Sequence, residues 1–115
     1  MNSNVIESKS FDFAVRIVRL HKCLKSRQCD IAIARQLLRC GTSIGANVAE
    51  AQKGQSKADF NAKMNIAMKE ANETYYWLRL LYATEYLSDK EFFSLENDIT
   101  EILAVITAIC KKTNN

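Results

Sequence analysis

The stretch Arg39–Gln52 reads RCGTSIGANVAEAQ and contains the pattern on which the fold depends. It has helix-forming surroundings and no proline, yet small residues recur every four positions, at Gly41, Gly45 and Ala49. Residues four apart lie above one another on one face of an α-helix. Because a glycine inside a helix costs ~1 kcal/mol relative to alanine, this stripe predicts that the backbone of a second helix approaches closely there.

The composition of the chain favours a single all-α domain spanning residues 1–115. Charged residues make up 25% and hydrophobic residues 48% of the chain, which fits a folded globular protein and excludes a disordered one. There is no proline, and there are only three glycines. A β-rich fold of this size would need more turn-forming residues, so we expect a few long helices joined by short loops.

Two amphipathic helices are expected in the first half of the chain. The first begins near Ser10, a good N-cap, with Asp12 in the first turn where the helix dipole favours an acid. The segment 26–30 is the expected break, and the second helix then continues to about Gly54. Each helix has an apolar seam of helical period. The seams are Phe13, Ile17, Leu20 and Leu24, then Ala34, Leu37 or Leu38, Gly41, Ile44, Val48 and Ala51.

Two further helices are expected in the second half. The third is capped by Ser56 and runs to about Tyr86, while the fourth starts at Ser88 with Glu91 completing a capping box. Four amphipathic helices with short loops predict an up-down antiparallel four-helix bundle. The apolar seams are Phe60, Met64, Ala67, Ala71, Tyr75, Leu78 and Tyr82, then Phe92, Leu95, Ile99, Ile102, Ile106 and Ile109.

The third helix carries a second stripe that a monomeric bundle does not need. It is apolar at both ends and acidic in the middle, and an aromatic residue, Tyr76, lies on the polar face beside it. This surplus surface predicts contacts between subunits, so we expect a homo-oligomer. The stripe consists of Ile66, Glu70, Glu73, Trp77 and Leu80.

Two stretches resemble a known family. They are residues 36–51, QLLRCGTSIGANVAEA, and residues 66–78, IAMKEANETYYWL. Both resemble the bacterial four-helix bundle proteins known as 23S ribosomal RNA intervening-sequence proteins, although Cys40 stands where that family commonly has serine. The resemblance implies a bundle that assembles into a homopentameric ring. A related branch, the accessory variability proteins of diversity-generating retroelements, comprises basic pentameric barrels that bind a reverse transcriptase and nucleic acid.

Glu50, Glu70 and Glu73 invite an enzymatic interpretation, because paired carboxylates can bind a metal or divide acid and base roles. Helical di-iron proteins use Glu-x-x-His pairs, but here Glu73 stands where the histidine would be. We therefore expect no enzyme, metal or cofactor. Instead we expect the carboxylates to accept hydrogen bonds across the contact of helices two and three, fixing their register. The expected donor is Thr42, Ser43 or Asn47.

Trp77 and the cysteines each have a structural and a functional interpretation. Trp77 could stack on a nucleic-acid base, but a tryptophan on an apolar stripe more often packs in a core or an interface. The cysteines form no C-x-x-C pair, and the single histidine, His21, lies next to only one of them, so a zinc site is not expected. We expect them to be reduced in a cytoplasmic protein without signal peptide or membrane span. They are Cys23, Cys29, Cys40 and Cys110.

Positive charge is concentrated in the first half of the chain. Residues 1–57 contain ten Lys or Arg and four acids, whereas residues 58–115 contain six and nine. A solvated face is one interpretation, and a surface for the phosphates of RNA or DNA, multiplied in a ring, is the other. A ring that binds only a protein partner, such as a reverse transcriptase, is the alternative function. The candidate phosphate-binding residues are Arg16, Arg19, Lys22, Lys25, Arg27, Arg35 and Arg39.

Overall fold

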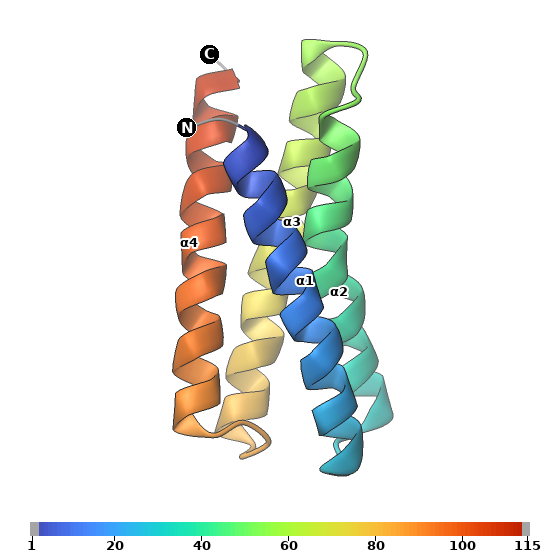
Figure 1. The fold of residues 1–115 in the computed structure, drawn as a ribbon, viewed down its shortest axis with the longest axis vertical. Helices are drawn as coiled ribbons and strands as arrows, with labels where there is room; N and C mark the ends of the chain where they lie inside the picture. The colour runs from blue at the N-terminus through green and yellow to red at the C-terminus, as the bar shows by residue number, and fades with distance from the viewer. Residues whose placement is uncertain (1–2, 114–115) are drawn as a thin grey trace.

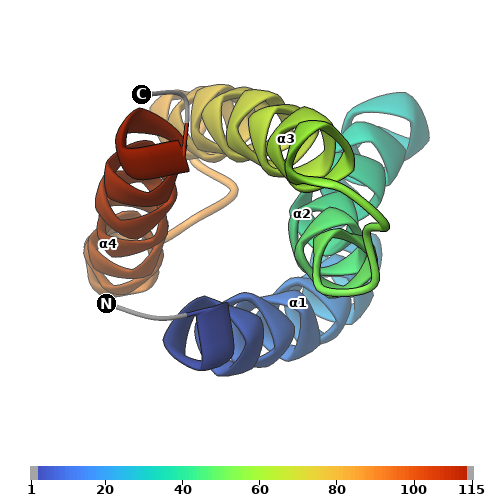
Figure 2. The ribbon, with the colours of Figure 1, turned by 90° about the horizontal axis from the view of Figure 1, so that it is seen from above.

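Four antiparallel helices form the protein, as seen in a computed structural model that describes residues 3–113. Consecutive helices are neighbours, and α4 returns to contact α1, so the four enclose one core (Figure 1). Figure 2 shows this closed arrangement from the end of the bundle. The predicted up-down four-helix bundle is therefore confirmed. The helices are α1 (Ser3–Ser26), α2 (Ile31–Ala51), α3 (Lys57–Ala83) and α4 (Asp89–Thr113).

The core consists of the predicted apolar seams, with adjustments in α2 and α3. Every seam residue predicted for α1 and α4 is buried. In α2, Leu37 is buried and Leu38 half-buried. In α3 the three aromatic seam residues are only half-buried, and Thr74 and Leu81 occupy core positions that the predicted seam omitted. The buried face of α3 thus consists of Met64, Ala67, Ala71, Thr74, Leu78 and Leu81.

The start of α1 differs from the prediction. Ser10 is not an N-cap but a fully buried residue inside the helix, and its hydroxyl donates to the Ile6 carbonyl at 2.7 Å. Ile6 is also fully buried and lies on the same face as Phe13. This burial extends α1 back to Ser3. A serine inside a helix returns its hydroxyl to the preceding turn, so capping preference alone placed the helix start wrongly.

The predicted helix starts at Ser56 and Ser88 are confirmed. The Ser56 hydroxyl accepts a hydrogen bond from the Asp59 amide at 3.0 Å. Ser88 and Glu91 form the predicted capping box, in which each side chain accepts from the other residue's amide at 3.1 and 2.9 Å. Asp30 caps α2 in the same way, by accepting from two amides of its first turn. Side-chain capping therefore fixes three of the four helix starts.

Two helices end on a residue in the left-handed region. Gln28 has φ 61° after α1, and Glu85 has φ 69° after α3. At the second of these ends the Tyr86 amide donates back to the Leu81 carbonyl at 2.9 Å, which is a Schellman ending. This reversal stops α3 at Ala83, earlier than the predicted end near Tyr86.

Two of the three residues in the small-residue stripe of α2 face α1. A Cβ added at Gly45 would lie 3.2 Å from the Ser10 carbonyl oxygen, so the predicted close approach of a helix backbone is present there. A Cβ added at Gly41 would lie 2.9 Å from the Ile17 side chain. Ala49, in contrast, is exposed, and its predicted place in the contact is wrong. A spacing of four drifts about 40° around the helix at each step, which carries Ala49 away from α1.

Candidate nucleic-acid interface

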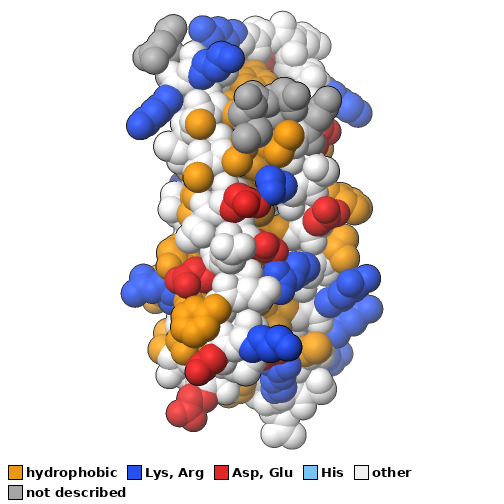
Figure 3. Space-filling view, turned by 60° about the vertical axis from the view of Figure 1, so that its left-hand side comes forward, with side chains coloured by type: hydrophobic (Ala, Val, Ile, Leu, Met, Phe, Trp, Pro, Cys, Tyr) orange, Lys and Arg blue, Asp and Glu red, His pale blue; other side chains and the backbone are white. Residues whose placement is uncertain are grey.

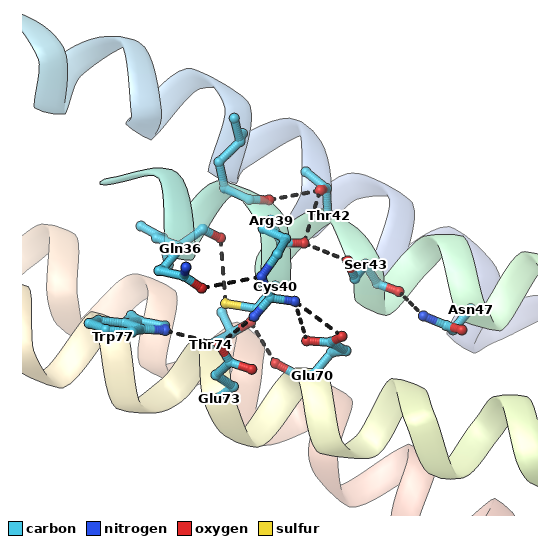
Figure 4. Close-up of polar contacts among 12 residues, drawn as sticks. Gln36, Arg39, Cys40, Thr42, Ser43, Asn47, Glu70, Glu73, Thr74 and Trp77 are labelled. Atoms are coloured by element: carbon cyan, nitrogen blue, oxygen red, sulfur yellow. Dashed lines mark hydrogen bonds and ion pairs between the residues drawn. The ribbon is translucent and has the colours of Figure 1, made fainter. Parts of the chain in front are cut away.

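Arg39 joins α2 to both acids of the third helix's Glu-x-x-Glu motif (Figure 4). One guanidinium nitrogen lies 3.2 and 3.3 Å from the two Glu70 oxygens, and the other pairs with Glu73. The Trp77 indole also donates to Glu73, at 3.3 Å. The Arg39 guanidinium lowers the pKa of Glu73 below its ordinary value of 4.5. These four residues form a charged cluster that holds α2 against α3.

The donors to the carboxylates are not the predicted ones. Thr42, Ser43 and Asn47 each donate to a carbonyl four residues earlier in α2, at 2.7, 2.6 and 2.8 Å. Short polar side chains inside a helix commonly bond to the preceding turn in this way. The carboxylates pair with long cations instead: Glu70 and Glu73 with Arg39, and Glu50 with Lys63 at 3.2 Å.

Three of the seven candidate phosphate-binding residues are in ion pairs within the chain. Arg39 is one of them. Arg16 of α1 pairs with Asp98 of α4 at 2.5 Å, and Arg27 pairs with Glu91 at 2.7 Å. The Arg27 guanidinium holds the pKa of Glu91 at about 2. In Figure 3 acidic and basic side chains lie beside each other along this part of the surface. Each of these arginines thus already has a carboxylate partner within the bundle.

The other four candidates form a separate group, which we call the basic end. All four are exposed, and none makes an ion pair with another residue among 3–113. The short turn between α1 and α2 brings the last turns of one helix beside the first turns of the other (Figure 1). The basic end therefore presents four cations that are in no ion pair with a carboxylate of the described residues. Its members are Arg19, Lys22, Lys25 and Arg35.

A pocket of about 370 Å³ opens between α1 and α2 at the basic end. Lys25 and Arg35 line it from opposite helices, and His21 lies beside them. Its wall includes Ile31, whose side chain is 67% exposed. Sequence reasoning did not select His21 or Ile31. The available signal was that Ile31 lies off the buried seam of α2 and needs another reason for its exposure. The remaining lining residues are Gln28, Cys29 and Ala34.

Exposed apolar side chains lie on more than one face of the bundle. On α1, Phe11 is 67% and Val18 41% exposed. On the far side, Tyr76 of α3 and Phe93 of α4 are also exposed. The stripe predicted on α3 is divided: its two acids pair with Arg39 and its tryptophan is half-buried, whereas Ile66 at its start is 41% exposed. The exposed residues of α1 were missed, although they lie off the apolar seam in the sequence.

The histidine, cysteines and acids of the described residues gather into no group of three or more that could hold a metal ion. Cys29, Cys40 and Cys110 are buried, and burial raises the pKa of each thiol above its ordinary value. Cys23 is exposed, and all four cysteines are free. No helix between residues 3 and 113 combines the length and apolar character needed to cross a membrane.

The sequence of this chain matches the family of the 23S rRNA-intervening sequence protein over residues 2–108. The chain belongs to this family. A crystal structure of an S23 ribosomal protein family member with unknown function, from Bacteroides thetaiotaomicron VPI-5482, is similar over nearly the whole length. It is 52% identical, the match covers 96% of this chain and 99% of that chain, and the TM-score is 0.93. No curated protein matches the chain.

Membership in the 23S rRNA-intervening sequence protein family confirms the resemblance inferred from residues 36–51 and 66–78. The matched region, residues 2–108, includes all of the basic end, the Arg39 cluster and the pocket between α1 and α2. The Bacteroides protein gives the same fold but no activity. The function of these sites therefore has to be argued from their chemistry.

Proposed function

We propose that this protein is a non-enzymatic, cytoplasmic homo-oligomer that binds nucleic acid. RNA is its main ligand, and binding occurs through phosphate contacts at the basic end. The observation that carries the proposal is the group of four exposed cations with no carboxylate partner among the described residues. Cations that neutralise phosphates release condensed counterions, and this release drives binding without regard to sequence. The family name, which refers to 23S rRNA, supports RNA as the polyanion.

Assembly strengthens the proposal. One copy carries a net charge of +3, and a ring would place several basic ends on one particle. Collected charge of one sign raises both the local concentration of a polyanion and its association rate. The exposed apolar residues of α1 and of the α3–α4 side, on two different faces, provide the surfaces for such a ring. We propose a pentamer, in keeping with the resemblance.

The test is a charge reversal confined to the basic end. Arg19→Glu, Lys22→Glu and Lys25→Glu together should weaken binding of a fluorescein-labelled RNA at least about tenfold and flatten its salt dependence. Arg16 is left unchanged, because a glutamate there would face Asp98. Binding is measured by fluorescence anisotropy at two salt concentrations, and oligomer mass and helicity are measured alongside it.

The matched control reverses three lysines elsewhere: Lys57, Lys69 and Lys90. They are exposed, lie on α3 and α4, and make no ion pair with a described residue, so the net charge changes equally. Only the variant of the basic end should lose binding. Equal losses would mean that net charge and not this surface attracts the RNA. No binding by the unaltered protein at low salt would contradict the proposal and favour a ring that binds a protein partner, such as a reverse transcriptase.

A further inference from the structure

The pocket between α1 and α2 has features that binding of a phosphate backbone alone does not require. Lys25 and Arg35 approach it from different helices, as a pair of cations around one anion would. Between them lies a partly open pocket of about 370 Å³ with mainly apolar walls. Pockets that hold small molecules begin at about 300 Å³. A backbone phosphate bound by exposed lysines needs no such volume, so the pocket has room for a larger group attached to the anion.

The side chains around the pocket suit a flat ring. His21 and Arg35 line the pocket, and their imidazole and guanidinium are planar groups of the kind on which unstacked bases pack. Ile31 adds an apolar contact, and its 67% exposure in the free protein leaves that surface open to a ligand. Lys25 supplies a point charge for the phosphate.

No carboxylate lines this pocket. Asp30, the acid next in sequence to it, is directed to the start of α2, where it accepts hydrogen bonds from the amides of Ala32 and Ile33 at 2.9 and 3.2 Å. One oxygen of that carboxylate is therefore engaged at the helix end, while the residue itself stays next to Cys29 of the pocket wall. The pocket combines two cations, a histidine and an apolar wall, with no anion among its lining residues.

We propose that this pocket binds one unstacked nucleotide of single-stranded nucleic acid. The base packs against His21 and Ile31, and the phosphate lies between Lys25 and Arg35. This inference rests on the proposed function and goes beyond it, because phosphate contacts alone do not distinguish single strands from duplexes. Bases inside a duplex are stacked and paired, so only a single strand, of RNA or DNA, can place a base in the pocket.

The first test compares a labelled single-stranded oligouridylate, the matching oligodeoxythymidylate, and an RNA duplex of the same length. We expect both single strands to bind about tenfold more tightly than the duplex. The double variant Lys25→Ala, Arg35→Ala should lose about tenfold in single-strand affinity and much less in duplex affinity. The control, Lys57→Ala with Lys69→Ala, removes the same charge from exposed positions on α3. It should change neither affinity more than about twofold.

The second test uses the single histidine of the chain as a probe. Uridine 5′-monophosphate should change the NMR chemical shifts of the His21 imidazole in the unaltered protein. The double variant should lose this change. Ile31→Asp, a change at an exposed position that should leave the helix folded, should weaken it as well.

The outcomes separate the inference from the function on which it rests. Equal binding of single strands and duplex, or equal effects of the two double variants, would overturn the proposal that the pocket binds a nucleotide. Either result would leave phosphate binding at the basic end intact. An unshifted His21 signal at saturating uridine 5′-monophosphate would also overturn the pocket proposal. No binding of any oligonucleotide would overturn the proposed function and this inference together.

Discussion

Gly45 lets α1 and α2 approach each other at the level of the backbone. Its missing side chain leaves room for the Ser10 carbonyl, and the buried Ser10 hydroxyl is already satisfied within its own helix. Two small residues therefore meet, one from each helix. The sequence indicated that a partner helix approaches here, but not which one, because a stripe of glycines carries no information about its partner.

Substitutions at Gly45 should measure how tight this contact is. Gly45→Leu should cost more than the ~1–3 kcal/mol typical of overpacking, because the obstacle is the backbone of α1. Gly45→Ala should not gain the ~1 kcal/mol that helix propensity would otherwise provide. Urea denaturation measures both free energies of unfolding. Ala49→Leu is the control, since Ala49 is exposed and should change stability by less than ~0.5 kcal/mol. Equal tolerance of leucine at both positions would contradict the contact.

Glu91 should make the bundle sensitive to acid. Its pKa in the folded protein is about 2, compared with an ordinary value of 4.5, because Arg27 donates to both its oxygens and Ser88 donates through its amide. A lowered carboxyl pKa stabilises the fold above pH 4.5, and this contribution is lost as the pH falls toward 2. The side chain is about a third exposed, so after allowance for solvent screening we expect about 1–2 kcal/mol.

The variant Glu91→Gln isolates this charge, because glutamine can still complete the capping box. It should be less stable than the unaltered protein at pH 7 and should lose part of its acid sensitivity between pH 4.5 and 2. Denaturation midpoints across this range measure the effect. Glu85→Gln, an exposed acid without an ion pair in the described part of the chain, is the control. Parallel pH profiles for Glu91→Gln and the unaltered protein would refute the prediction.

At the scale of the helices, ion pairs connect α1 and α4, which pack against each other less extensively than the other neighbouring helices. The contact between α1 and α4 is the sparsest in the bundle. Lys9 pairs with Glu101 there, and Arg16 pairs with Asp98. The basic first half and the acidic second half of the chain thus face each other within one molecule. Part of the charge asymmetry that suggested nucleic-acid binding is explained by this internal pairing.

The helix ends at Gln28 and Glu85 offer a test of the turns. An L-residue in the left-handed region costs about 1–2 kcal/mol, and glycine avoids most of that cost. Glycine also loses more backbone entropy on folding, so Glu85→Gly should stabilise the protein by a net ~0.5–1 kcal/mol. Glu85→Ala keeps the unfavourable φ and should give no gain. Thermal denaturation of both variants measures the difference, and equal stability of the two would contradict the assigned turn.

Much of each helix could be predicted from the sequence, because the spacing of apolar residues and the capping residues depend only on nearby sequence. The seam of α4 and the capping box at Ser88 were predicted correctly for that reason. The start of α1 was not, because it depends on the burial of Ile6 in the assembled core. Likewise, the sequence singled out Arg16 and Arg19 equally. Only the packing of α1 beside α4 separates the paired arginine from the unpaired one.

At the scale of the whole molecule, the exposed apolar residues lie on opposite sides of the bundle. Phe11 and Val18 lie on α1, and Tyr76 lies on α3, diagonally across the bundle (Figure 2). A contact between two unlike patches is heterologous, and such contacts close into rings when the rotation between neighbours is right. A contact of a patch with its own copy would give a dimer instead.

We therefore expect light scattering at micromolar concentration to give a mass several times 13.1 kDa. Phe11→Asp with Val18→Asp should reduce this mass without changing helicity, because both side chains point away from the core. Ala46→Asp with Ala49→Asp adds the same charge to the exposed face of α2 and is the control. A monomeric mass for the unaltered protein would contradict assembly altogether. An unchanged mass in the α1 variant alone would show that neighbouring copies meet through other surfaces, and a ring joined through α1 would then be excluded.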